Sequence, residues 1–418
     1  MNNIVKLVVV SFTLFSSAIL SAKTDLLETE STSAYEVLVP TSNYNPFTWF
    51  KRQCVQHPKR TAAIAVGGVA AAAVGYKLFS EDPLQNFTKE DLEFAGKAKA
   101  LVQATDKKLP IVYHKDYNIS LAGVEKLHSF DSQKYRRVYN HLVTTVGIKP
   151  ERFHTPTMAT QDDLLKVHTS AYLDSLNSSA AVAKIVYLPQ LNYLPHFVLR
   201  RNLLEPMKLA TSGTVLATEL ALQEGWAINL GGGYHHAKAT EGSGGCAFSD
   251  IALAIHWVHE LHPNYKILVV DLDAHQGNGV EMICGPDKRV SIFDVYNEDM
   301  YPQDKAAKKY IDFNHPVKSG IKDKAYLKIL ADHLPAAIAA SKPDLIVYNA
   351  GTDIYEKDPL GRMSVSEAGI IERDEFVFRC ALDEKIPVVM ILSGGYTKES
   401  HSIISKSITN ILQMVLKP

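Results

Sequence analysis

The chain has 418 residues, of which 46% are hydrophobic and 21% are charged, and its formal net charge is −1. This length and composition are those of a globular protein with one large domain or two smaller ones. The near-zero charge predicts no direct binding of nucleic acid, because such binding depends on a strongly basic surface. The four cysteines form no CxxC pair, which excludes a zinc ribbon or thioredoxin motif, and we expect free thiols.

The first 22 residues differ from the rest of the chain in composition. A single Lys6 precedes an uncharged apolar run over 7–20, and the small pair Ser21-Ala22 follows it. This is the layout of a bacterial-type signal peptide, with an uncleaved anchor as the alternative. We therefore expect residues 1–22 to direct export from a bacterial-type cell, so that the protein is secreted, periplasmic or tethered to a membrane. Action on the proteins of another cell, including those of its nucleus, is a hypothesis that follows from this expectation.

Residues 23–105 are expected to form an N-terminal extension to a larger domain over 106–418. The stretch 24–46 is rich in Ser, Thr, Asn and acidic residues and shows little periodicity, which predicts disorder. An uncharged run over 61–76, rich in Ala and Gly, has basic residues on both sides. Its length is marginal for a membrane helix, and a buried or linker helix is the alternative. Membrane association through 61–76 therefore stays open.

From Leu109 onward, short β-branched runs alternate with helical patterns. The predicted strands are 111–113, 227–230, 266–270, 290–295, 345–350 and 387–392. One predicted helix, 212–225, starts in a Ser/Thr-rich cap region and ends at a glycine. Another begins at Ser249 or Asp250 and ends before Pro263. Near-continuous apolar strands that alternate with amphipathic helices indicate an α/β fold, with a mostly parallel central sheet and helices on both faces.

Unusual polar residues follow the predicted strands. The loop after 227–230 reads GGGYHHAKATEGSGG, and the loop after 266–270 reads DLDAHQGNG. GTD and SGGY follow the last two strands. Because ligands of parallel α/β sheets bind beyond the carboxyl ends of the strands, the sequence predicts one site at one edge of one sheet.

Asp273, His275 and Asp353 are candidate metal ligands in these loops. Residues i and i+2 at a strand end project to the same side, so Asp271, Asp273 and His275 share a direction. Asp353 arrives from another strand end. Three protein ligands and one open position are typical of a catalytic zinc site, whereas a structural site is closed by four. A turn or cap is the alternative for an isolated DxD, and Met282 excludes a calcium loop because the closing Glu is required there.

The adjacent His235 and His236 and the Tyr396 of SGGY add further chemistry. A histidine beside a metal can act as general base toward water. A phenol that follows two glycines can approach a ligand closely and donate to a developing oxyanion. Taken singly, each residue is more commonly a solvated or packed side chain. Together with the metal ligands, they predict metal-assisted hydrolysis of an amide.

Four segments, GGGYHHAKATEGSGGCAFSD, DLDAHQGNG, YNAGTDIYEKDPLGRMSVS and SGGY, resemble the zinc-dependent histone deacetylase superfamily. Two segments, IVYHKDYNISLAGVEKLHSFDSQKY and DLDAHQGNG, resemble its class IV branch in particular. The resemblance covers about 111–416, nearly three quarters of the chain, and leaves 1–105 outside it. It implies an arginase–deacetylase α/β fold, and it makes 106–418 a deacetylase catalytic domain.

The resemblance also implies a role for each candidate residue. His236 is implied to be the general base and then the general acid, with Asn278 supporting its imidazole as an acceptor. His235, hydrogen-bonded to Asp271, is implied to be its electrostatic partner. Tyr396 is implied to bind the acyl carbonyl and its oxyanion. The implied ligands of Zn²⁺ are Asp273, His275 and Asp353. A K⁺ site is implied as well, near Asp271, Asp273, His275, Asp294 and Val295. The implied walls of the substrate tunnel are Gly244, Gly245, Tyr301 and Gly394.

Two positions depart from the class I pattern. Asn278 stands where class I enzymes have an Asp, and a neutral partner predicts a lower pKa for His236. Gly245 stands where class I enzymes place an aromatic side chain, which leaves room for a bulkier acyl group or for a residue from elsewhere. Because class IV relatives are similar to long-chain deacylases, acetyl is not assumed to be the preferred acyl group.

The sequence therefore predicts a zinc-dependent lysine deacylase that acts on acylated proteins or peptides, with histone tails among the candidates. A small-molecule amide hydrolase, such as an acetylpolyamine deacetylase, is a second interpretation. A catalytically silent acyl-lysine binding module is a third. The complete ligand set, both histidines and Tyr396 argue against the third interpretation.

Overall fold

The computed structural model describes residues 87–121, 125 and 130–417. The predicted leader over 1–22, the stretch 24–46 and the candidate membrane helix over 61–76 all lie outside the described residues. Among the helices of the described part, none combines the length and the apolar character that a membrane span requires.

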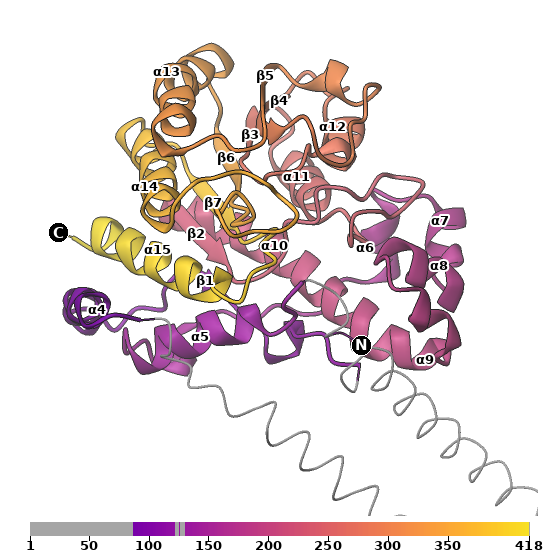
Figure 1. Ribbon diagram of the computed structural model, residues 1–418, viewed down its shortest axis with the longest axis horizontal. Helices are drawn as coiled ribbons and strands as arrows, with labels where there is room; N and C mark the ends of the chain where they lie inside the picture. The colour runs from indigo at the N-terminus through magenta and orange to yellow at the C-terminus, as the bar shows by residue number, and fades with distance from the viewer. Residues whose placement is uncertain (1–86, 122–124, 126–129, 418) are drawn as a thin grey trace, which may run out of the picture. The chain divides into compact units, whose positions relative to one another are not determined.

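A seven-stranded parallel sheet forms the centre of the part of the chain that the structure describes (Figure 1). Its strands are β1 (Ile111–Val112), β2 (Trp226–Asn229), β3 (Ile267–Asp271), β4 (Val290–Asn297), β5 (Phe313–Val317), β6 (Leu345–Asn349) and β7 (Val388–Ile391). They lie in the order β1-β2-β7-β6-β3-β4-β5, and every neighbouring pair is parallel. The predicted α/β fold with a parallel sheet is confirmed.

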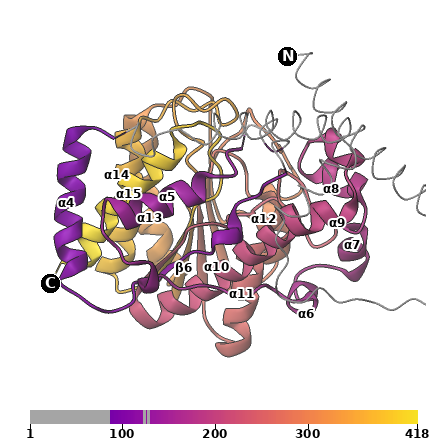
Figure 2. The ribbon, with the colours of Figure 1, turned by 90° about the horizontal axis from the view of Figure 1, so that it is seen from below.

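Helices bury both faces of this sheet, which is why its inner strands are apolar at nearly every position. In β3, Leu268 and Val270 belong to one hydrophobic cluster, whereas Ile267 and Val269 belong to another. Alternate residues of a strand point to opposite faces, so the two clusters are the two sides of the sheet. Figure 2 shows α13 and α14 on one side and α10 and α11 on the other.

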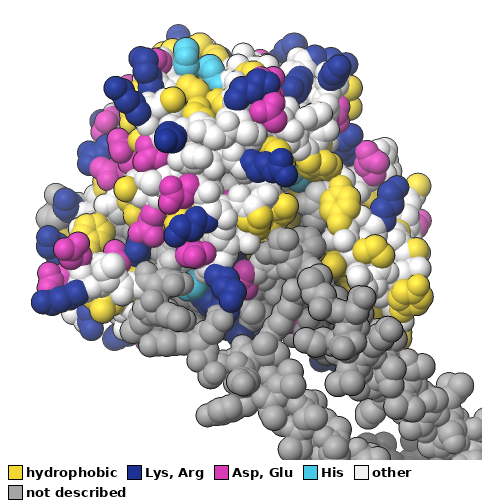
Figure 3. Space-filling view, in the orientation of Figure 1, with side chains coloured by type: hydrophobic (Ala, Val, Ile, Leu, Met, Phe, Trp, Pro, Cys, Tyr) yellow, Lys and Arg dark blue, Asp and Glu magenta, His cyan; other side chains and the backbone are white. Residues whose placement is uncertain are grey.

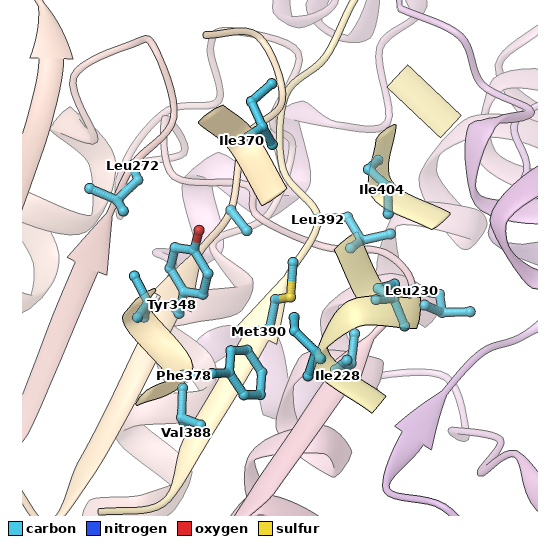
Figure 4. Packing of buried hydrophobic residues seen from close by; sticks show 14 of the residues in the cluster. Ile228, Leu230, Leu272, Tyr348, Ile370, Phe378, Val388, Met390, Leu392 and Ile404 are labelled. Carbon is cyan, nitrogen blue, oxygen red and sulfur yellow. The ribbon is translucent and has the colours of Figure 1, made fainter. Parts of the chain in front are cut away.

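The first face carries the larger cluster. Its helices are α4 (Lys89–Gln103), α5 (Lys134–Thr144), α13 (Asp323–Ser341), α14 (Glu367–Asp383) and α15 (Ser400–Val415). Figure 4 shows Phe378 of α14 beside Val388 and Met390 of β7. The second face is covered by α10 (Glu205–Glu224), α11 (Asp250–Leu261) and α12 (Asn278–Cys284).

A third hydrophobic cluster lies among the short helices between α5 and α10 (Figure 1). These helices are α6 (Gln161–Leu165), α7 (Ser170–Ser175), α8 (Ser179–Ile185) and α9 (His196–Leu199). Within the described residues, the short 3₁₀ or π turns are η1 (Lys115–Tyr117), η3 (Pro150–Arg152), η4 (Pro189–Tyr193), η5 (Arg200–Leu204) and η6 (Lys308–Tyr310). The turn between α8 and η4 brings Val186 and Leu188 to the wall of the cavity described below.

Helix α4 lies in the predicted N-terminal extension but packs against the helices of the larger domain. The boundary between 105 and 106 stays a prediction. The side chains of Thr88 and Asp91 close a capping box at the start of α4. Lys406 of α15 lies 2.9 Å from the Asp91 carboxylate, and Gln413 donates to the Phe94 carbonyl at 2.9 Å. The capping box was readable in TKED, but the sequence interpretation assigned this segment to the extension.

Strand β5 and the start of α10 also differ from the prediction. β5 was missed because His315 and Pro316 interrupt its apolar pattern. Proline lacks a backbone N–H, and it is tolerated here because β5 lies at the edge of the sheet. α10 begins at Glu205, seven residues before the predicted cap at 212, and it follows the π turn η5 directly. Pro206 is tolerated in its first turn because the missing N–H costs little there. The end of α10 at Gly225, which has φ of 83°, is as predicted.

Candidate active site

Polar residues from four loops meet at one end of the sheet. The loops follow β2, β3, β6 and β7, which are contiguous in the order β2-β7-β6-β3. A cavity of about 100 Å³ lies there, and its wall includes His235, His236, Asp273 and Tyr396. The structure therefore brings residues of the predicted loops together at one end of the sheet.

Asp273, His275 and Asp353 form a compact buried group. One ligand atom from each lies within 4.8 Å of the others. His275 Nδ1 is 3.1 Å from Asp273 Oδ1 and 2.9 Å from Asp353 Oδ2. Burial and repulsion from Asp273 raise the pKa of Asp353 to about 7. Two buried carboxylates that repel each other around one imidazole fit a divalent cation, and carboxylate and imidazole are ligands that Zn²⁺ accepts.

The remaining carboxylate oxygens of this group are held by the surrounding loops. Asp273 Oδ2 accepts hydrogen bonds from Ser393 Oγ and the Gly394 N–H, both at 2.9 Å. Asp353 Oδ1 accepts one from the Ala274 N–H at 2.8 Å. These hydrogen bonds fix the orientation of the Asp273 and Asp353 carboxylates. Residues that hydrogen-bond to metal ligands have the same effect in metal sites.

The two histidines have different partners. His235 Nδ1 lies 2.8 Å from Asp271 Oδ2, and Asn349 Nδ2 donates to the other Asp271 oxygen at 2.9 Å. His236 Nδ1 lies 2.9 Å from Asn278 Oδ1. Since an amide oxygen only accepts, His236 Nδ1 carries a proton and its Nε2 has the free lone pair. Both contacts that the resemblance implied are present.

These partners move the two histidine pKa values in opposite directions. Burial lowers the pKa of His235, but Asp271 and Asp273 outweigh it and raise the value to about 9. Burial, together with His235 and His275, holds the pKa of His236 well below its ordinary value. At neutral pH, His235 is an imidazolium and His236 is a neutral base. Such a separation within one site is typical of acid–base catalysis.

Tyr396 completes the group. Its N–H donates to Asp358 Oδ2 at 2.8 Å, and its ring lies edge-on to His275 at 6.1 Å. Burial and the carboxylates of Asp273 and Asp353 raise the pKa of the phenol well above its ordinary value. The hydroxyl is therefore a proton-bearing donor at neutral pH.

The comparison with known proteins follows this geometry. The family profile described as the histone deacetylase domain matches residues 128–412. Histone deacetylase 2 of Arabidopsis thaliana is 45% identical over 304 residues, which cover 73% of this chain and 79% of the plant protein. The chain belongs to the histone deacetylase family.

More distant relatives agree with this membership. An uncharacterised protein of Picosynechococcus is 32% identical over 295 residues, covering 71% of this chain and 94% of the bacterial protein. Histone deacetylase 1 of Homo sapiens is 28% identical over 311 residues, covering 71% of this chain and 63% of the human protein. The crystal structure of the HDA15 HD domain superposes with a TM-score of 0.60 at 23% identity, covering 73% of this chain and 88% of that one. This last likeness concerns the fold alone.

The tunnel residues predicted for this histone deacetylase domain fall into two groups. Gly244, Gly245 and Gly394 line the cavity. A Cβ atom at Gly244 would lie 2.1 Å from His236 Cδ2, whereas one at Gly245 would meet nothing within 4 Å. Tyr301 is absent from the cavity wall and instead packs edge-on against the His236 ring, with centroids 5.0 Å apart.

The residues named for a K⁺ site lie on β3 and β4, beside the metal group. Asp294 pairs in register with Asp271, and Val295 is the next buried residue of β4. Asp294 Oδ2 accepts the Gly277 N–H at 3.0 Å. Burial, repulsion from Asp271 and Glu281, and a hydrogen bond shared with the Glu281 side chain raise the pKa of Asp294. The carboxylates of Asp271 and Asp294 are therefore neighbours in the interior, and the K⁺ site stays a prediction.

Sequence reasoning missed several residues that hold the site. Asp250 was interpreted as a helix cap, but its carboxylate accepts the N–H groups of Gly233 (2.8 Å) and Tyr234 (2.7 Å) and so fixes the loop before the histidines. Lys134 is fully buried, and its Nζ donates to the carbonyls of Ser393 (2.5 Å) and Gly394 (2.9 Å). The GGG spacing before the histidines pointed weakly to Asp250, and no local pattern pointed to Lys134.

Proposed function

We propose that this member of the histone deacetylase family is a zinc-dependent hydrolase of the acyl amide on lysine side chains of proteins. The observation that carries the proposal is the pairing around one cavity of a neutral base, His236, with a protonated donor, Tyr396. Both face the group formed by Asp273, His275 and Asp353. An acyl-lysine binding module needs a pocket but has no use for a separated pair of histidine pKa values.

The residues of this chain divide the reaction between them. When bound by Asp273, His275 and Asp353, Zn²⁺ would act as a Lewis acid toward the carbonyl and the attacking water. His236 Nε2 takes a proton from the water while the water oxygen bonds to the carbonyl carbon. The Tyr396 hydroxyl donates to the oxygen on which negative charge develops.

Collapse of the tetrahedral species completes the hydrolysis. The carbon–nitrogen bond breaks, and His236 returns its proton to the leaving lysine nitrogen. The products are a carboxylic acid and a free lysine amine. The imidazolium of His235, held by Asp271, keeps the pKa of His236 low enough for it to return the proton readily.

The acyl group would enter the cavity. Its wall includes buried apolar side chains, among them Leu121, Val186, Leu188, Leu203 and Met207. This lining supports the proposal that acyl chains longer than acetyl are accepted. The DLDAHQGNG segment with its neutral Asn278 supports a class IV-like assignment. Asp271, Asp294 and Val295 support a K⁺ site behind the histidines.

Acylated peptides, histone tails included, are the proposed substrates, and direct nucleic-acid binding is not proposed. On the face seen in Figure 3, basic and acidic side chains are intermixed, which supports this view. Export from a bacterial-type cell remains a proposal that rests on the composition of 1–22. Fractionation of tagged full-length protein tests it, and strict retention in the cytosol of the producing cell would overturn it.

The decisive experiment is a turnover screen with the full-length chain and with zinc per chain quantified. Acetyl- and myristoyl-lysine peptides from histone and other proteins are compared with acetylated polyamines. Faster turnover of the peptides supports the proposal, and faster turnover of polyamines supports the small-molecule alternative. Binding of acyl-lysine peptides without any turnover by the zinc-loaded chain would establish the binding module instead.

A further inference from the structure

Tyr187 occupies a backbone position that a tyrosine rarely takes. Helix α8 ends at the cap residue Val186, and Tyr187 follows with φ of 53°. The Leu188 N–H donates to the Ala183 carbonyl at 3.0 Å, and the Tyr187 N–H donates to the Lys184 carbonyl at 3.3 Å. These two bonds define a helix end whose left-handed residue is usually glycine, because a Cβ atom there is strained.

Burial does not compensate for this strain. The Tyr187 side chain is 57% exposed. A large aromatic residue that is both strained and exposed breaks two local rules at once, and such positions are concentrated at functional sites.

The Tyr187 ring begins an aromatic path that ends at the general base. It packs edge-on against Tyr301, with centroids 6.3 Å apart and an angle of 81°. Tyr301 packs edge-on against His236, with centroids 5.0 Å apart and an angle of 76°. Tyr301 is itself 38% exposed, so the path runs from solvent to His236.

The turn that carries Tyr187 is hydrogen-bonded to Gly245, a residue of the cavity wall that has no side chain. The Gly245 N–H donates to the Ile185 carbonyl at 3.0 Å, two residues before Tyr187. A Cβ atom at Gly245 would meet nothing within 4 Å, so the space beside this glycine is open. Val186 and Leu188, on either side of Tyr187, line the cavity that also holds His236 and Tyr396.

A substrate amide held by His236 and Tyr396 carries an acyl chain on its carbonyl carbon and a lysine side chain on its nitrogen. These two parts must extend from the amide in different directions. The acyl group can be enclosed, because the cavity wall includes several buried apolar side chains. The lysine stem must reach solvent, because it is attached to a protein. Outside the cavity wall, Tyr187 and Tyr301 form a partly exposed aromatic surface that reaches from solvent to the His236 ring.

We propose that Tyr187 is a specificity-determining residue that packs, together with Tyr301, against the methylene stem of the acyl-lysine substrate. It extends from the α8–η4 turn, which is linked to Gly245 through the hydrogen bond between the Gly245 N–H and the Ile185 carbonyl. The inference rests on the proposed lysine deacylase function. Stacking methylenes on an aromatic face removes apolar area from water, and an aromatic ring does this with little loss of side-chain freedom.

The test variant is Tyr187→Gly in the full-length, zinc-loaded chain. Glycine suits the left-handed position, so the thermal midpoint is expected to stay the same or to rise. The KM for an acetyl-lysine peptide is expected to rise about tenfold, with kcat retained to within about twofold. Hydrolysis of 4-nitrophenyl acetate, which has no lysine stem, is expected to stay unchanged.

Two further variants serve as controls. Tyr187→Phe keeps the ring and is expected to restore the wild-type KM. Tyr193→Ala removes a tyrosine that is 88% exposed on η4 and has no part in the Tyr187–Tyr301–His236 path. Its KM is expected to equal that of the wild-type chain.

The outcomes separate this inference from the proposed function. An unchanged peptide KM in Tyr187→Gly overturns the inference, and so does an equal loss with the ester, which would indicate a distorted site. A loss in Tyr187→Phe as large as in Tyr187→Gly would assign the effect to the hydroxyl and overturn packing by the ring. If the wild-type chain hydrolyses the ester but no lysine peptide, the proposed function fails, whatever Tyr187 does.

Discussion

Replacing Asn278 by Asp is expected to move the acidic limb of the pH–rate profile upward. Asn278 Oδ1 lies 2.9 Å from His236 Nδ1. It offers a hydrogen bond but no charge, and burial with two neighbouring histidines holds the pKa of His236 well below its ordinary value. A carboxylate at this distance would stabilise the imidazolium and raise that pKa. Because the base acts only when unprotonated, activity would then be lost at a higher pH.

The size of the effect follows from the surroundings of Asn278. Opposite unit charges about 4 Å apart interact by about 4 kcal/mol at an effective dielectric constant of about 20. Part of this is lost because the new carboxylate is buried and faces Asp304, whose Oδ2 now accepts a hydrogen bond from Asn278 Nδ2 at 3.3 Å. We therefore expect the limb to move by about 1–2 pH units, equivalent to about 1.4–2.7 kcal/mol.

The assay is kcat/KM for an acyl-lysine peptide between about pH 5 and 9, with zinc per chain measured at each pH. A double variant, Asn278→Asp with Asp304→Asn, removes the repulsion between the two carboxylates and is expected to show the larger shift. Asp304→Asn alone is the matched control and should leave the limb in place. Coincident limbs in the wild-type chain and in both variants that carry Asn278→Asp, at equal zinc content, would refute the reasoning.

Three more changes test other parts of the site. Tyr396→Phe is expected to lower kcat by about 10²–10³ at unchanged zinc content, since it removes one oxyanion donor; turnover near the wild-type level would remove that role. In the zinc-stripped chain, the pKa of Asp353 near 7 means that charging this buried acid costs stability. The unfolding midpoint should therefore fall as pH rises from about 4 to 7, and Asp353→Asn should flatten this slope. Lys134→Met leaves the Ser393 carbonyl without its donor. It should lower the urea-derived free energy of unfolding by about 1–3 kcal/mol, and a change under about 0.5 kcal/mol would contradict this.

The sequence predicted those site residues that carry reactive side chains and also lie close together in the sequence or at predicted strand ends. In DLDAHQGNG, the period of two along an extended chain predicted that Asp271, Asp273 and His275 point to one side. Their contacts then distinguish them, because Asp271 contacts His235 whereas Asp273 contacts His275. The other strand ends follow from the rule for parallel sheets alone. The pattern therefore predicted which loops meet, although not the distances at which they do.

Residues whose partners are distant in the sequence could not be identified from a local sequence pattern. Asp250 resembles an ordinary helix cap, and only the fold shows that its carboxylate binds the loop of Gly233 and Tyr234. Tyr187 is one aromatic residue among many until its left-handed backbone and its ring contact are known. In the fold itself, β5 was hidden by the proline of an edge strand, whose tolerance there depends on its neighbours.

The spacing of the metal ligands depends on two buried cations that are distant from them in sequence. Where parallel strands end, the next backbone carbonyl groups no longer accept hydrogen bonds from a neighbouring strand. When they are buried, they need other hydrogen-bond donors. Arg373 of α14 supplies them to Leu272 at 3.1 Å and Gly351 at 2.6 Å, beside the two ligand carboxylates. Lys134 does the same for the loop after β7, where Gly394 in turn holds Asp273. Asp374 pairs with Arg373 at 2.8 Å, so its charge is balanced locally. Buried donors therefore hold the backbone on which the candidate zinc ligands lie, which is what a preorganised catalytic site requires.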